Sequence, residues 1–131
     1  NDSNRSEILI FDSNKIYLDA YNANPTSMLA AISNFENINI NNRVLILGDM
    51  FELGDYSDQE HQKIVDFVTN KDYSKVYLVG DNFSKCSIDG EYFFKFSNTS
   101  ELVQSDSFKG LKNMNILVKG SRGVSLEKLF K

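Results

Sequence analysis

Short apolar runs alternate along this chain with segments in which apolar residues recur every three or four positions. Runs of strand length that are rich in branched and aromatic residues predict β-strands at 7–11, 15–20, 44–47, 76–79, 92–96 and 116–118. The runs at 44–47 and 76–79 are continuously apolar, which is typical of strands covered on both faces. Turn residues at 12–14 join the first two runs, and this spacing predicts an N-terminal β-hairpin.

Helical spacing predicts helices between these strands. The first helix follows Asn24 and Pro25, because asparagine is a good N-cap and proline suits the first helical position. The sequence SDQE at 57–60 matches a capping box and predicts a second helix with Ser57 as its N-cap. A helical turn at 82–86, a weak helix from about 97 to 107 and a closing helix complete the pattern. The apolar face of the first helix consists of Met28, Ala31, Ile32 and Phe35, and that of the second consists of His61, Ile64, Val65 and Val68. The apolar face of the closing helix consists of Leu126, Leu129 and Phe130.

The alternation of strands and helices implies an α/β fold with a mainly parallel sheet and helices on both faces. In such sheets, ligands bind beyond the carboxyl ends of the strands. This rule selects three loops as candidate binding segments, at residues 21–25, 49–54 and 119–123.

Composition narrows the classes of function. The 131 residues suit one domain, and 41% hydrophobic residues are enough for a buried core. A formal net charge of −4 argues against nucleic acid as a partner, because phosphate binding needs a basic face. The single cysteine, Cys86, cannot form an internal disulfide, and no apolar run approaches the roughly 18 residues of a membrane span.

The first residues of the chain are polar. Residues 1–6 are typical of an inter-domain linker and 7–131 of the domain that follows it, so we expect further domains upstream. The segment lacks the apolar stretch of a signal peptide, which makes a cytoplasmic setting the default expectation. By physical reasoning alone, Arg5 is a solvated linker residue.

The first candidate loop places a carboxylate and two amides at a strand end and a helix start. Asp19, Asn22 and Asn24 could contact a nucleotide or a peptide, because amides both donate and accept hydrogen bonds and a helix start favours anions. An asparagine–proline helix cap beside a solvated aspartate accounts for the same residues.

The second loop carries two carboxylates around an apolar pair. Asp49 and Glu52 could hold an ammonium group or a magnesium ion. Alternatively, Met50 and Phe51 pack into the core while both acids face water. His61 follows on the apolar face of the second helix, and no serine or cysteine beside it forms an evident triad. We therefore predict a packed, hydrogen-bonded histidine.

The third loop outlines an anion site. Lys119 and Arg122 bring two cations, and Ser121 a hydroxyl, to a predicted helix start. Arginine can grip a carboxylate or phosphate with two hydrogen bonds. The alternative is a glycine-rich helix entry with exposed charges. Neither a Walker A loop nor a Gly-x-Gly-x-x-Gly pattern occurs in the chain.

Four segments resemble a known family. They read NRS at 4–6, LDAYNANPTSM at 18–28, LGDMFELG at 47–54 and VKGSRG at 118–123. The segment at 18–28 closely resembles the signature of the UDP-N-acetylmuramoyl-tripeptide–D-alanyl-D-alanine ligases, and the others resemble further segments of that family in the same order. The resemblance spans nearly the whole chain and implies a Mur ligase C-terminal domain with a Rossmann-like three-layer fold. Phe51 and Val124 stand where leucine and methionine are more usual.

The function that this resemblance implies belongs to the whole ligase. Such a ligase uses ATP and magnesium to phosphorylate the carboxylate of a UDP-N-acetylmuramoyl tripeptide, and the amine of D-alanyl-D-alanine then attacks the acyl phosphate. The UDP-binding N-terminal domain and the central ATPase domain are absent here. We therefore expect this domain alone to be inactive, with no catalytic residue or metal ligand of its own. Its expected partners are those two domains and the two substrates.

The resemblance also implies residue roles. Arg5 resembles the arginine that reaches an ATP phosphate, and Asp19 resembles the acid near the ribose. Asn22 and Asn24 would lie by the nucleotide. The residues expected to contact the incoming amino acid or peptide are Lys119, Ser121 and Arg122, and Asp49 and Glu52 join them as substrate-binding candidates without an assigned role.

Three alternatives stay open at this point. A sister Mur or folylpolyglutamate-type ligase would share the fold, although the sisters tend to carry histidine in the region of the YNANP loop. A receiver-like signalling module would place Asp49 and Lys119 at strand ends, but it also needs an acidic pair after its first strand. The third alternative is a generic binding module without a catalytic role.

Overall fold

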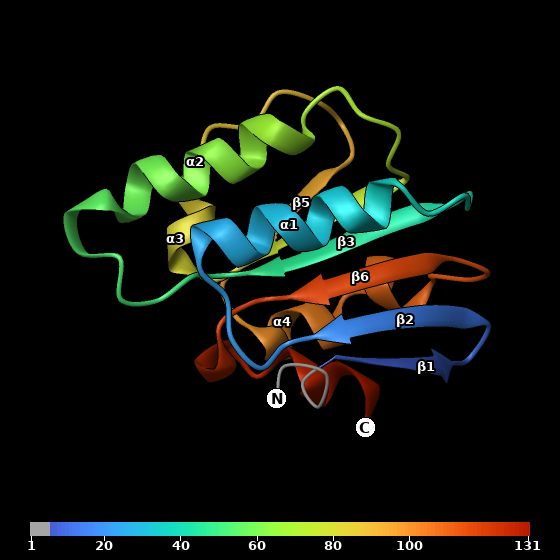
Figure 1. Ribbon diagram of the computed structural model, residues 1–131. Helices are drawn as coiled ribbons and strands as arrows, with labels where there is room; N and C mark the ends of the chain where they lie inside the picture. Colours follow the sequence, from blue (N-terminus) through green and yellow to red (C-terminus); the bar gives the residue numbers. More distant parts are fainter. Residues whose placement is uncertain (1–5) are drawn as a thin grey trace.

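Six strands form one sheet in the computed structural model, which describes residues 6–131 (Figure 1). Their order across the sheet is β1-β2-β6-β3-β4-β5. The strands are β1 (Glu7–Phe11), β2 (Asn14–Asp19), β3 (Arg43–Gly48), β4 (Lys75–Val79), β5 (Phe93–Phe96) and β6 (Asn115–Lys119). β1 is antiparallel to β2, and the other neighbouring pairs are parallel. The predicted hairpin and mainly parallel sheet are confirmed.

Helices cover both faces of this sheet (Figure 1). One face carries α1 (Pro25–Glu36), α2 (Ser57–Val68) and the short α3 (Asp81–Ser84). The opposite face carries α4 (Thr99–Gln104), α5 (Asp106–Lys109) and the 3-10 helix η4 (Leu126–Phe130). Two further 3-10 helices, η2 (Gly54–Tyr56) and η3 (Arg122–Val124), lie in loops. These layers confirm the α/β, Rossmann-like three-layer fold, and no helix of the described residues is both long and apolar enough to span a membrane.

The central strands are buried on both faces. In β3, Leu45 and Leu47 pack under α1 and α2, whereas Val44 and Ile46 join the core of the opposite face. None of these four side chains is exposed. Because successive strand residues point to opposite faces, one continuous apolar run supplies both cores at once. The prediction drawn from that continuous run is confirmed.

α1 begins as the sequence predicts. Asn24 Oδ1 accepts the N–H of Ser27 at 2.9 Å, and Ser27 Oγ accepts the N–H of Asn24 at 3.1 Å. This reciprocal capping box satisfies two backbone donors, and Pro25 occupies the first helical position. The loop after β2 therefore ends at a well-defined residue.

Three local predictions differ from the structure. The N-cap of α2 is Tyr56, without a side-chain hydrogen bond, because η2 leads directly into the helix and Ser57 is already helical. The weak helix near 97–107 is the two helices α4 and α5, divided at Ser105, whose side chain accepts the N–H of Phe108. The closing helix is 3-10 helix η4, entered through the left-handed backbone of Ser125.

Candidate functional site

The loops after β2, β3 and β6 meet at one edge of the sheet. Their strands are parallel neighbours, so their carboxyl ends lie side by side. Ser121 ties these loops together from the β6 side. Its N–H donates to the carbonyl of Asp49 at 3.0 Å, and its Oγ accepts the N–H of Phe51 at 2.9 Å. The same Oγ lies 3.4 Å from the carbonyl oxygen of Ala23, so the three loops selected from the sequence form one site.

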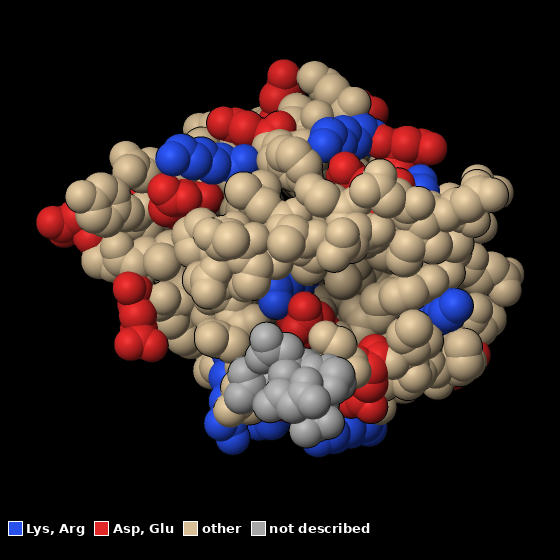
Figure 2. All heavy atoms as spheres, in the orientation of Figure 1, with Lys and Arg blue, Asp and Glu red and all other residues tan. Residues whose placement is uncertain are grey.

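A buried ion pair joins the ends of β2 and β6. Lys119 Nζ donates to Asp19 Oδ2 and to the carbonyl of Asn22, both at 3.0 Å. The two residues are partners in the parallel register, which places their side chains on the same face. The Lys119 side chain is 4% exposed and that of Asp19 28%. Figure 2 shows basic and acidic atoms adjoining in a hollow on this face, with uncharged surface above them.

A polar pocket of about 260 Å³ adjoins this ion pair. It is lined by Ser6, Asp19, Tyr21, Asn22, Asn24, Ser27 and Lys119. Asn22 Oδ1 accepts the N–H of Ala23 at 2.9 Å, and the amide nitrogen of Asn22 makes no hydrogen bond to a described residue. The structure thus gathers Asp19, Asn22 and Asn24 in one pocket, while their contact with a nucleotide stays a prediction.

The two acids of the second loop have different environments. Asp49 is 4% exposed, and its two carboxylate oxygens accept the N–H groups of Asn82 and Phe83, each at 2.9 Å. The carboxylate therefore binds the first turn of α3. Gly80 leaves room for it, because a Cβ there would lie 2.3 Å from the Asp49 carboxyl carbon. Glu52 is exposed and has a positive φ of 65°. Substrate contacts of both acids stay predictions.

His61 is a buried structural residue, as predicted. Its Nε2 accepts the N–H of Met50 at 2.9 Å, so the hydrogen must be on Nδ1, which donates to the carbonyl of Ser57 at 2.7 Å. The ring is 0% exposed and packs edge-on against Phe83, with 4.7 Å between centroids. His61 therefore anchors the start of the second loop to α2.

Arg122 is the exposed cation of the third loop. Its guanidinium carbon lies 5.2 Å from the centroid of the Tyr21 ring, within cation–π distance. It forms no ion pair with a described residue. Arg5, the arginine expected to reach an ATP phosphate, lies outside the described residues.

The donor set of this site suits part of a nucleotide and does not suit a metal ion. Asp19 offers a partly exposed carboxylate oxygen, and Asn22 an amide nitrogen that makes no hydrogen bond within residues 6–131; these groups match hydroxyl and carbonyl groups of a ligand. Magnesium needs several oxygen ligands in octahedral geometry. No cluster of three or more His, Cys, Asp or Glu side chains in residues 6–131 could hold a metal ion.

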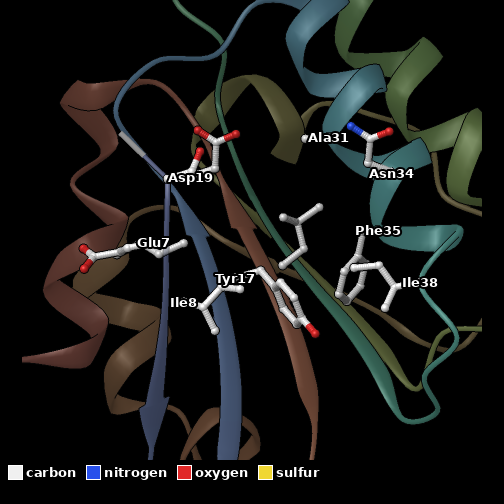
Figure 3. Close-up of a pocket in the computed structure, with 11 residues that line it drawn as sticks. Glu7, Ile8, Tyr17, Asp19, Ala31, Asn34, Phe35 and Ile38 are labelled. Carbon is white, nitrogen blue, oxygen red and sulfur yellow. The ribbon is translucent and has the colours of Figure 1, made fainter. Parts of the chain in front are cut away.

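Sequence reasoning missed an apolar groove next to the polar pocket. The groove has a volume of about 520 Å³ and runs between the β1–β2 hairpin and α1, with Tyr17, Phe35 and Ile38 in its walls (Figure 3). Asp19 and Ser6 line both hollows. Ile8 is 62% exposed here because α1 does not extend over β1. The apolar residues of β1 were the available signal, but the sequence alone does not say which of them a helix covers.

Comparisons with known proteins agree with this architecture. Residues 4–122 match the family described as Mur ligase, glutamate ligase domain. The chain is 35% identical, over 95% of its length, to the UDP-N-acetylmuramoyl-tripeptide–D-alanyl-D-alanine ligase of Rickettsia prowazekii, and 35% identical, over 97%, to that of Buchnera aphidicola. A crystal structure of MurF from Acinetobacter baumannii superposes on 95% of the chain with a TM-score of 0.80 and 29% sequence identity.

The chain corresponds to only part of these relatives. It spans 28% of each of the two curated proteins and 28% of the Acinetobacter chain. The match to the family covers all six strands of the sheet, the first two loops of the site and the third loop as far as Arg122. The receiver-like alternative is not favoured by any of these similarities. The chain belongs to the Mur ligase family, as a glutamate ligase domain of the kind found at the C-terminal end of these enzymes.

Proposed function

We propose that this chain is the C-terminal domain of an ATP-dependent ligase that joins D-alanyl-D-alanine to a UDP-N-acetylmuramoyl tripeptide in peptidoglycan synthesis. Residues 7–131 are the domain and residues 1–6 its linker to a central ATPase domain, which a UDP-binding domain precedes. Since the reaction consumes ATP, we expect it to take place in the cytoplasm.

One observation carries this proposal. The loops after β2, β3 and β6 form one connected site at the carboxyl edge of the sheet, because Lys119 pairs with Asp19 and Ser121 hydrogen-bonds to Ala23 and Phe51. Six relatives that are 28–35% identical to this chain bear the name of the D-alanyl-D-alanine-adding ligase. The same edge carries the YNANP loop on which the resemblance to that ligase rests.

The geometry supports a division of roles within the site. Asp19 and Asn22 line the polar pocket and would bind the sugar or base of ATP, with Asn24 at the same helix start. Lys119 neutralises Asp19 and donates a hydrogen bond to the Asn22 carbonyl, so it would fix the orientation of both residues in the pocket. Ser121 and Arg122 would contact the incoming dipeptide, and the exposed Arg122 guanidinium, which forms no ion pair within residues 6–131, would pair with its carboxylate.

ATP would supply the phosphoryl group that activates the tripeptide carboxylate. The described residues fit an edge of a nucleotide, whereas magnesium and most phosphate contacts would belong to the central domain. Closure of this domain over the central one would exclude water from the activated carboxyl group. On this proposal, the isolated domain is inactive.

The test uses the complete product of the gene, supplied with ATP, magnesium and a UDP-N-acetylmuramoyl tripeptide. Phosphate release is measured with D-alanyl-D-alanine, with single amino acids, and without an amine. We expect release that requires the dipeptide. An enzyme that binds ATP but responds instead to a single amino acid or to glutamate would overturn this proposal in favour of a sister ligase.

A further inference from the structure

An exposed aromatic side chain stands in the loop after β3, at the edge of the sheet that carries the site. Phe51 is 45% exposed, although the preceding residue, Met50, is 1% exposed. Ligands bind at this edge of α/β sheets, so an aromatic ring exposed here is a candidate apolar contact for a ligand.

The backbone that carries Phe51 is fixed from two sides. The N–H of Met50 donates to Nε2 of the buried His61, and the N–H of Phe51 donates to Oγ of the buried Ser121, both at 2.9 Å. Two consecutive backbone donors are thus bound by side chains from α2 and from the loop after β6. Such support holds a side chain in one position before a ligand arrives.

The ring itself lies against the loop after β6. A Cβ added at Gly123 would come within 2.6 Å of Phe51 Cε2, so the glycine provides the space that the ring occupies. Gly123 follows Arg122 directly, and both belong to η3. The aromatic ring and the exposed guanidinium are therefore carried by segments in direct contact.

We propose that Phe51 forms the apolar wall of the subsite for the amine substrate, next to the cation Arg122. This inference rests on the ligase function proposed above. D-Alanyl-D-alanine suits such a wall because it has two methyl groups and one terminal carboxylate. The methyl groups gain contact with the ring, and Arg122 pairs with the carboxylate. An amine substrate with a charged side chain would lose hydration against the ring, so the wall selects against it.

The experiment measures KM for D-alanyl-D-alanine with the complete ligase, at saturating ATP and tripeptide. We expect Phe51→Ala to raise this KM about tenfold, the scale on which apolar pockets distinguish small groups, and to leave KM for ATP unchanged. Phe51→Leu keeps an apolar wall and should stay within about threefold of the wild type. Ile88→Ala is the matched control, because Ile88 is 38% exposed but lies in a separate hollow beside α2.

The same assay tests His61 as a positioning residue for Phe51. His61→Ala should raise KM for the dipeptide, whereas His61→Gln should restore it, because the glutamine Oε1 can accept the Met50 N–H in place of Nε2. Val68→Ala is the control on α2, since Val68 is equally buried but belongs to the other end of the helix. It should lower stability without changing KM for the dipeptide.

The outcomes separate the two proposals. A wild-type enzyme that requires the dipeptide, combined with an unchanged dipeptide KM in folded Phe51→Ala, overturns the role of Phe51 alone. Equal increases in KM for the dipeptide and for ATP would also overturn it. A folded wild-type enzyme that does not use the dipeptide overturns the proposed function, and the Phe51 subsite with it.

Discussion

The buried pair Asp19–Lys119 predicts an asymmetry between its two single variants. Asp19→Ala leaves an ammonium group that is 4% exposed, with only the carbonyl of Asn22 as acceptor. Lys119→Met leaves a carboxylate that is 28% exposed and that water can reach, while the methionine retains the packing of the lysine stem. Removing the acid should therefore cost much more stability than removing the base.

The magnitudes follow from the burial of the two groups. Breaking a fully buried pair costs about 3–5 kcal/mol, and the partial exposure of Asp19 reduces this to about 2–3 kcal/mol for Asp19→Ala. Lys119→Met should cost about 1 kcal/mol. The double variant removes both charges of the pair, so it should be more stable than Asp19→Ala alone, with a coupling energy of about 1.5–2 kcal/mol.

Urea unfolding of the 131-residue chain, followed by far-UV circular dichroism, measures all four free energies of unfolding. The slopes m should agree among the variants, because the surface exposed on unfolding is nearly the same. If Lys119→Met proved the more damaging variant, or if the two effects were additive, the ion pair would not hold these strand ends together as the structure indicates.

Three further predictions concern single residues. Asp49→Ala should lower the free energy of unfolding by about 2–4 kcal/mol, because two buried N–H groups lose a charged acceptor. In the same urea titration, Asp55→Ala is the control and should change this free energy by less than about 0.5 kcal/mol, because Asp55 is exposed. Asn24→Ala should cost about 1 kcal/mol through loss of the N-cap of α1, and Asn24→Ser should recover most of it; equal losses in the two variants would contradict the capping role. Burial raises the pKa of the Cys86 thiol to about 11. Alkylation by iodoacetamide in the folded protein should therefore be slow at pH 8 and should accelerate about tenfold per pH unit up to pH 11. A rate that levels off near pH 9 would refute this prediction.

Local signals in the sequence were sufficient for most elements. Asn24 and Pro25 mark the start of α1 because capping depends on residues within one helical turn. The same kind of signal misled at Ser57, because the sequence SDQE is also compatible with a helix that continues from a preceding 3-10 turn. Local patterns determine that a helix begins there, and the path of the incoming loop determines which residue caps it.

The candidate site shows the same division. Strand order could not be read from the sequence, yet it is the adjacency of β2 and β6 that brings Lys119 within 3.0 Å of Asp19, 100 residues away. Asp49 was recognisable as an acid at a strand end, but its partners Asn82 and Phe83 belong to α3, which follows the neighbouring strand β4. That the Asp49 carboxylate binds the N–H groups of α3 could therefore be seen only in the tertiary structure.

By itself, the sequence determined the α/β class, the N-terminal hairpin, the strands covered on both faces and the three loops that could bind a ligand. It did so because hydrophobic periodicity and capping are short-range properties of the chain. Only the tertiary structure decided that Ser121 joins all three loops, that His61 accepts a hydrogen bond from Met50, and that Phe51 remains exposed against Gly123. These contacts join residues far apart in sequence, and their geometry follows from strand order and helix packing, which no local pattern specifies.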